Sequence, residues 1–285
     1  MFSSCSKIFT VRQEKFLRRP VLSGSFPVHA KKLPKSRAAA RSRGRLAHFV
    51  VLQHEPTAHL ALFAPMIADA GHRMTVVLLG RDSLPPLDDV DALWILGGAM
   101  DVFEEDIHPW LIDEKRYIRE AVQHRGLAAF GICLGHQLMA ESLGGACAKG
   151  GAEIGVLGVT ISAPSPFLAD MPPTFPVLIW HGVEVTALPP GATCVATSED
   201  CAVHAIQYGP RAFSMQSHPE VGPDVVADWA AIPAAAVVLA DRLGPDGADR
   251  LTDDVARHFP DLQRNARTLF DNWCRQVGIP SEVPA

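Results

Sequence analysis

Between residues 47 and 145, apolar runs of strand length alternate with helix-like segments, and this alternation most constrains the fold. The apolar runs are AHFVVLQ (47–53), HRMTVVLL (72–79), ALWILGG (92–98) and LAAFGIC (127–133). The segments with helical apolar spacing, each ending at glycine, are 59–71, 110–126 and 136–145. Strands that are apolar throughout are typical of a parallel sheet with helices on both faces. We therefore expect an α/β fold with a mostly parallel sheet.

The pattern changes after this region. From about 152 to 217, short strand-like pieces are separated by Pro and Gly turns, which favours small antiparallel additions to the same sheet. After 223 the chain is again helical, and we expect 251–259 and 261–276 to be its last two elements, preceded by GPDG (244–247). We divide the chain into an N-terminal extension (1–45), an α/β domain (46–222) and a helical C-terminal extension (223–285).

Basic residues are concentrated in the first 45 positions, which hold twelve Lys or Arg and a single acid, Glu14. Three interpretations stay open: an organelle transit peptide, a flexible basic tail, or an upstream extension from a misassigned start. In each case we expect this segment to be disordered and to take no part in the chemistry. The net charge of −5 gives no reason to expect nucleic-acid binding, and no apolar run reaches the ~18 residues of a membrane helix.

None of the six cysteines forms a CxxC pair, and we expect none to pair with a His at metal-ligand spacing. A reducing compartment fits this usage better than a disulfide scaffold does. We expect a cytoplasmic protein, with organelle targeting by residues 1–45 as the alternative, and neither a metal nor a cofactor.

The stretch FGICLGHQL (130–138) contains the first candidate site residue. Cys133 ends an apolar strand and begins a helix, and glycines stand two positions away on both sides. This spacing is similar to a nucleophile elbow, in which a tight strand-to-helix turn exposes the nucleophile at the carboxyl edge of a parallel sheet. The helix N-terminus favours a thiolate, and the N–H of Leu134 would face an oxyanion. The alternative is a buried, inert cysteine.

Two further segments offer the partners that a nucleophilic cysteine needs. In SMQSHPEV (214–221), His218 is a candidate base, and Glu220 is placed to orient its imidazole. In LGGAMDVFEED (96–106), two glycines follow a buried strand, so that Gly98 can offer a second oxyanion donor. Taken alone, the first segment reads as a surface loop with a charged pair and the second as a turn.

Six motifs occur together, in an order and spacing that resemble the class I glutamine amidotransferase family, most closely the GMP synthase-type glutaminase domain and its free-standing relatives. They are LGGAM, PWL with a following charged helix, GICLGHQLMAESLGG, EIG, WHG and QSHPEV. The resemblance covers roughly residues 47–222. It implies a flavodoxin-like sheet and an enzyme that hydrolyses the side-chain amide of glutamine.

The resemblance also implies roles for seven residues. Cys133 attacks the amide carbon to give a γ-glutamyl thioester, His218 transfers protons, and Glu220 orients His218. Gly98 and Leu134 supply the oxyanion hole, while Gln137 and His181 bind substrate. Three positions depart from the family pattern: Gly182 in WHG, Ser217 before His-Pro-Glu, and Ala99 in place of a common proline.

Nothing after residue 222 resembles a nucleotide-using synthetase domain. We therefore expect the ammonia to be released to a separate synthetase in trans, with glutamine as substrate. The alternatives are a stand-alone hydrolase of γ-glutamyl peptides or other γ-glutamyl compounds, and a weakly active regulatory or binding subunit.

Overall fold

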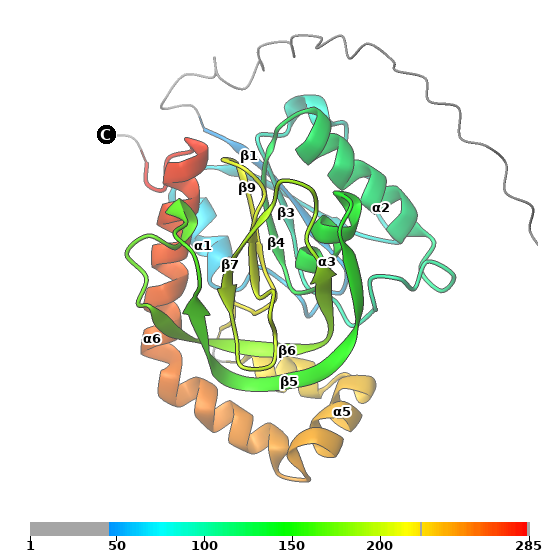
Figure 1. Cartoon of the computed structure of the whole chain (residues 1–285), viewed down its shortest axis with the longest axis vertical. Helices are drawn as coiled ribbons and strands as arrows, with labels where there is room; N and C mark the ends of the chain where they lie inside the picture. The colour runs from blue at the N-terminus through cyan, green and yellow to red at the C-terminus, as the bar shows by residue number, and fades with distance from the viewer. Residues whose placement is uncertain (1–45, 223, 284–285) are drawn as a thin grey trace, which may run out of the picture. The chain divides into compact units, whose positions relative to one another are not determined.

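The computed structural model describes residues 46–222 and 224–283 (Figure 1). Expectations about residues 1–45 therefore fall outside the described residues. The strands are β1 (His48–Gln53), β2 (Arg73–Leu78), β3 (Ala92–Ile95), β4 (Ala128–Ile132), β5 (Ala146–Ile161), β6 (Thr174–Ala187), β7 (Thr193–Thr197), β8 (Ala205–Gln207) and β9 (Ala212–Met215). The α-helices are α1 (Phe63–Asp69), α2 (Trp110–Arg119), α3 (Leu134–Ser142), α4 (Val225–Ala230), α5 (Pro233–Leu243) and α6 (Gly247–Val277). Short helical turns are η2 (Leu87–Asp89), η3 (Glu120–His124) and η4 (Pro166–Leu168).

In the described part of the chain the strands form one nine-stranded sheet with the order β2-β1-β3-β4-β9-β8-β7-β5-β6. The first five strands in this order, β2, β1, β3, β4 and β9, are mutually parallel. The remaining pairings are antiparallel, and β5 and β6 form a long ribbon that meets β7 through only two residue pairs, at Thr160 and Ile161. The predicted mostly parallel sheet with antiparallel additions is confirmed.

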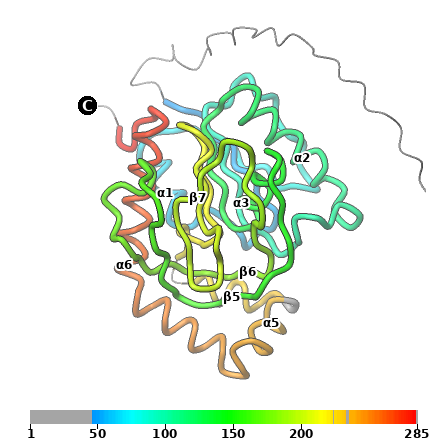
Figure 2. Tube along the Cα trace, viewed as in Figure 1, coloured from blue at the N-terminus to red at the C-terminus, as the bar shows by residue number. Residues whose placement is uncertain are grey.

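Alternate residues of the parallel strands enter two separate cores, one on each face of the sheet. In β1, Phe49 and Val51 belong to a core that α1 and α6 complete. Val50 and Leu52 belong to the opposite core, which α2 and α3 complete. This double burial explains why the central strands β3, β4 and β9 are largely apolar, whereas the edge strand β2 buries only Val77. The Cα trace in Figure 2 shows α6 on the same side as α1, and the two helices are in contact.

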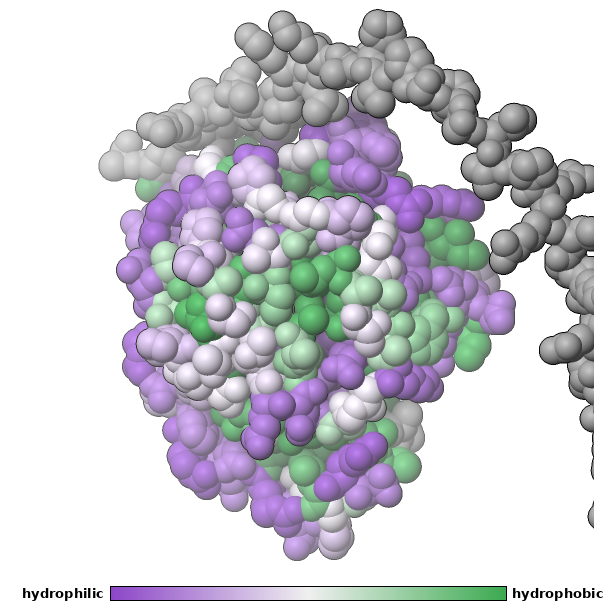
Figure 3. Space-filling view, viewed as in Figure 1, coloured by the Kyte–Doolittle hydropathy of each residue, from purple (hydrophilic) through white to green (hydrophobic). Residues whose placement is uncertain are grey.

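The C-terminal extension differs from the prediction, because the two expected elements are one helix. α6 runs for 31 residues, with Pro260 inside it. A proline removes one backbone hydrogen bond and disfavours helix, but burial on both sides of Pro260 outweighs this cost. Val255 and Leu262 pack in one cluster with α4 and α5, and Phe270 packs in the main core beside α1. The outer side of α6 is hydrophilic (Figure 3).

None of the helices in residues 46–222 and 224–283 combines the length and apolar character required to cross a membrane.

Candidate active site

Cys133 occupies a strained turn between β4 and α3. Its φ of 52° and ψ of −109° lie in a region that non-glycine residues rarely adopt. The flanking glycines make the turn sterically feasible, as the sequence predicts. A Cβ at Gly135 would overlap the Ile95 carbonyl oxygen, and a Cβ at Gly131 would overlap the Gly135 carbonyl oxygen. The strand and helix therefore approach closely enough to hold the Cys133 thiol at the sheet edge.

The loop after β3 brings Gly97 and Gly98 against the same thiol. A Cβ on Gly97 would lie 3.0 Å from His218 Cε1 and 3.5 Å from the Cβ of Cys133. A Cβ on Gly98 would lie 2.9 Å from the Cβ of His54. A side chain at Gly98 would force its neighbours to shift, and one at Gly97 would be tightly packed, because three chain segments converge there. The structure brings together the loop, the elbow and the His-Pro-Glu segment.

The backbone around this point leaves two N–H groups free for an anion. Within the described residues, neither Leu134 N nor Gly98 N donates to another backbone group. Leu134 N begins α3, where the first amides of a helix have no intrahelical acceptor. Both groups are suited to stabilise an oxyanion formed at Cys133.

His218 and Glu220 form a buried pair beside the thiol. His218 Nδ1 donates to Glu220 Oε1 at 2.8 Å, and His218 N donates to the Leu178 carbonyl of β6 at 2.8 Å. Burial disfavours the imidazolium, but Glu220 and Cys133 outweigh burial and raise the pKa of His218 to about 10. The His218 ring is therefore positively charged at neutral pH and holds a proton that it can give to a leaving group.

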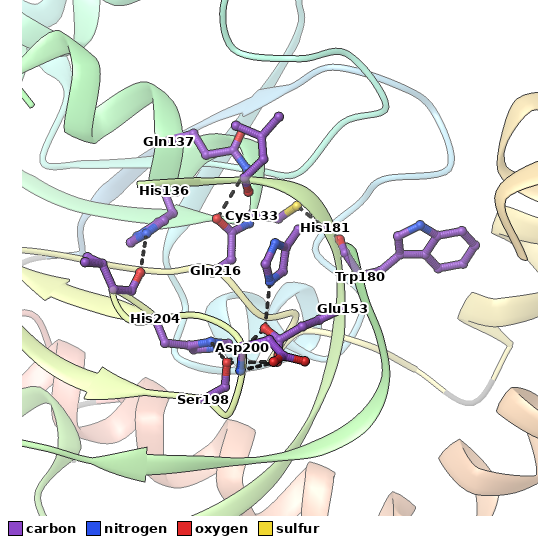
Figure 4. Close-up of polar contacts among 12 residues, drawn as sticks. Cys133, His136, Gln137, Glu153, Trp180, His181, Ser198, Asp200, His204 and Gln216 are labelled. Carbon is purple, nitrogen blue, oxygen red and sulfur yellow. Dashed lines mark hydrogen bonds and ion pairs between the residues drawn. The ribbon is translucent and has the colours of Figure 1, made fainter. Parts of the chain in front are cut away.

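Gln137 and His181 lie behind the thiol rather than on the pocket wall. Gln137 Nε2 donates to the Val183 carbonyl at 3.0 Å, and His181 Nε2 donates to Glu153 Oε2 at 3.0 Å. Figure 4 shows His181 pointing toward Glu153. Both side chains are buried and already bonded to protein partners. Trp180, one residue before His181, does reach the pocket, and its carbonyl oxygen lies 3.7 Å from Cys133 Sγ.

The pocket above Cys133 is an open cleft with a cavity volume of about 90 Å³. Its lining consists of Glu55, Ala58, Gly98, Ala99, Cys133, Trp180, His218, Trp229, Ile232 and Ala235. Three of these residues come from the C-terminal extension. The Trp229 ring packs edge-on against His218 at 4.7 Å and against Trp180 at 5.5 Å. Sequence reasoning missed this wall, because a single tryptophan in a helical segment carries no signal of a site.

A second buried polar cluster lies below His181. Ligand atoms of Glu153, Cys201 and His204 lie within 4.8 Å of one another, a set that can bind a divalent cation. Cys201 and His204 are separated by two residues, so the expectation that no cysteine pairs with a His at metal-ligand spacing was wrong. The Glu153 carboxylate, however, already accepts hydrogen bonds from His181, Ser198 and the backbone of Asp200 (Figure 4). Burial raises the pKa of the Cys201 thiol to about 12. We assign this cluster to the structural support of His181.

Comparison with known proteins identifies the family of the chain. The family model described as "Glutamine amidotransferase class-I" matches residues 62–226. Gamma-glutamyl peptidase 3 of Arabidopsis thaliana is 28% identical over 148 residues, 49% of this chain and 58% of the relative. A glutamine-hydrolysing GMP synthase of Thermotoga maritima is 33% identical over 143 residues, 49% of this chain and 26% of the relative.

The fold has a solved counterpart in a glutamine amidotransferase from Thermotoga maritima. The TM-score is 0.73 at 26% identity, and the match covers 82% of this chain and 99% of that one. The chain belongs to the class I glutamine amidotransferase family. The matched segment spans just over half of the plant peptidase and about a quarter of the GMP synthase.

Proposed function

We propose that this protein hydrolyses the side-chain amide of glutamine, or the equivalent γ-glutamyl bond, through a Cys133–His218–Glu220 triad. The observation that carries the proposal is the meeting of three features in one pocket. A strained cysteine stands beside a buried His218–Glu220 pair, and two backbone N–H groups there have no backbone acceptor in the described part of the chain. This combination fits attack on a carbonyl carbon.

In the first half-reaction, the Cys133 thiolate attacks the γ-carbonyl carbon, and the carbonyl electron pair moves onto oxygen. Gly98 and Leu134 donate their N–H groups to this oxyanion. The tetrahedral intermediate collapses when His218 gives its proton to the nitrogen, so that ammonia or an amine leaves and a γ-glutamyl thioester remains. In the second half-reaction, His218 takes a proton from water, and the resulting hydroxide attacks the thioester carbonyl. The C–S bond then breaks, which releases glutamate and regenerates the Cys133 thiolate.

Our first candidate for the reaction's purpose is ammonia supply to a separate synthetase. The relative named GMP synthase is described as glutamine-hydrolysing, and about half of this chain aligns with about a quarter of that protein. The pocket lies between the loop that carries Gly98 and the turn that carries Cys133, and we take glutamine to be its ligand. In this reading the ammonia released at His218 is consumed by a partner.

A second candidate, hydrolysis of γ-glutamyl peptides, is favoured by the aromatic wall beside the thiol. Trp180, Trp229 and Ile232 offer apolar surface, and ammonia has no apolar surface to bury against it. An amino-acid or peptide leaving group does have apolar surface that can be buried against this wall. One relative is named gamma-glutamyl peptidase 3.

The test is release of glutamate from the purified chain, offered glutamine and then γ-glutamyl dipeptides with small or large apolar leaving groups. Turnover of glutamine without a preference for dipeptides supports ammonia supply. A preference for large apolar leaving groups supports the peptidase reading. Absence of turnover, with Cys133 inert to a glutamine-like electrophile, would instead indicate a regulatory or binding subunit.

A further inference from the structure

A buried imidazole–carboxylate pair lies beneath the loop that carries Gly98. His54, directly after β1, and Glu114, in the first turns of α2, have fully buried side chains. His54 Nε2 lies 3.0 Å and 3.2 Å from the two Glu114 oxygens. His54 Nδ1 lies 3.0 Å from the Gly97 carbonyl oxygen. The ring also stacks on Trp110 at 5.7 Å.

The partners of His54 determine where its protons are. A carbonyl oxygen only accepts hydrogen bonds, so Nδ1 carries a hydrogen and donates it to Gly97. A carboxylate also only accepts, so Nε2 carries the second hydrogen. Burial opposes the charge on the ring, but Glu114, the bond to Gly97 and nearby Glu55 together raise the pKa of His54. The raised pKa favours the imidazolium form of His54, whose hydrogen bond to the loop is charge-assisted.

That hydrogen bond fixes the direction of one peptide group. The described residues contain no cis peptide bond, so the Gly97 C=O and the Gly98 N–H point in opposite directions across a planar unit. The Gly97 carbonyl points toward His54. The Gly98 N–H therefore points away from His54, and Gly98 lines the pocket with Cys133. Glycines on both sides of this peptide have little intrinsic preference that would hold it in one orientation.

We propose that His54, charged by Glu114, is a positioning residue that holds the 97–98 peptide with its N–H in the oxyanion hole. The inference rests on the proposed hydrolysis at Cys133 and adds to it the group that preorganises one of the two donors. A buried ion pair is a poor choice for packing alone, because an apolar pair of similar volume often gives equal or better stability. The hydrogen bond to Gly97 is what an apolar pair cannot supply.

Two variants separate positioning from packing. Glu114→Gln keeps a hydrogen-bonding partner for Nε2 but removes the charge that keeps His54 protonated. The double variant His54→Phe/Glu114→Met keeps the stacked ring and the side-chain volumes, and it removes both hydrogen bonds. Glu105→Gln, a neighbouring substitution of the same type at a carboxylate that accepts a hydrogen bond from Lys115, is the matched control.

Three readouts are measured for each variant. The first is kcat for glutamine or the best γ-glutamyl substrate. The second is the dissociation constant of a γ-glutamyl aldehyde, which forms a tetrahedral adduct with Cys133 and needs the oxyanion hole. The third is the alkylation rate of Cys133 by iodoacetamide, a displacement that forms no oxyanion. In addition, for the wild type and Glu114→Gln alone, ¹⁵N NMR of labelled histidine reports whether both nitrogens of His54 carry hydrogen.

We expect the double variant to lose about a hundredfold in kcat, the range seen when one oxyanion donor is removed. Aldehyde affinity should fall in parallel, Glu114→Gln should show a smaller loss of both, and alkylation should change by less than about threefold. Unchanged kcat and aldehyde affinity in a folded double variant, or an equal fall in alkylation, would overturn the positioning role. A wild type that neither turns over substrate nor binds the aldehyde would instead overturn the proposed function itself, and this inference with it.

Discussion

His218 and Glu220 are hydrogen-bonded at 2.8 Å, but their backbones are attached to different parts of the fold. His218 N donates to Leu178 of β6, whereas the Glu220 carbonyl accepts from Leu62 N, just before α1. The pair therefore connects the antiparallel ribbon to the start of α1, a helix that packs on the parallel part of the sheet. Its geometry relative to Cys133 depends on both halves being folded, so the site is a property of the whole domain.

The charge on His218 predicts a pH dependence of stability. The pKa of His218 is raised to about 10, against an unfolded value near 6.5. A raised pKa adds stability that is complete below about pH 6.5 and is lost as the pH rises toward 10. We expect the difference in free energy of unfolding between wild type and His218→Asn to be largest near pH 6 and to shrink toward pH 10. Urea unfolding at a series of pH values measures it; a difference that stays constant would contradict the charged pair.

Glu220→Gln should lower kcat by about ten- to a hundredfold, less than His218→Ala does. The carboxylate orients and charges the imidazole but does not transfer a proton itself. The loss should appear in kcat more than in KM, because substrate contacts remain. Steady-state kinetics of the two variants tests this order, and a larger loss in Glu220→Gln than in His218→Ala would be inconsistent with an orienting role.

The thiols should differ sharply in reactivity. Burial raises the pKa values of Cys147 and Cys201 to about 12, so both stay protonated at neutral pH. Cys133 lies at the N-terminus of α3 and lines the pocket beside His218. At pH 7 we expect limiting iodoacetamide to label Cys133 well before Cys147 or Cys201, as read by peptide mass spectrometry. Equal labelling of these three thiols would argue against an activated nucleophile.

Trp229→Ala should distinguish leaving groups. If the aromatic wall binds the leaving group, kcat/KM for γ-glutamyl dipeptides with large apolar leaving groups should fall about tenfold more than kcat/KM for glutamine. Val237→Ala, on the exposed side of α5, is the control. An equal effect on both substrates would assign Trp229 to the support of His218 instead.

Pro260→Ala should stabilise the protein. Pro260 lies inside α6 and lacks the N–H that would complete the helical ladder, and alanine restores it. We expect the free energy of unfolding to rise by about 1–3 kcal/mol with no change in activity. A loss of stability would show that α6 needs the proline for its packing against the sheet.

The sequence predicted the parallel strands and the tight turn at Cys133, because both depend mainly on residues that are close in sequence. The apolar runs gave the parallel strands, and the glycines around Cys133 indicated a tight elbow that the backbone angles of the structure show directly. The expected break at Pro260 was wrong, because tertiary burial of both halves of α6 outweighs the proline's preference. His54 and Trp229 reach the site only through long-range packing, and no spacing in the sequence marks either residue. The catalytic roles of Cys133, His218 and Glu220 stay predictions.

Ammonia and glutamate release by the purified chain, with Cys133→Ala as its partner variant, tests the central claim most directly. We predict measurable release by the wild type from glutamine or a γ-glutamyl peptide, and none above background from Cys133→Ala at an unchanged unfolding midpoint. Equal release by the two proteins would contradict the proposed mechanism, because no other described thiol lines the pocket.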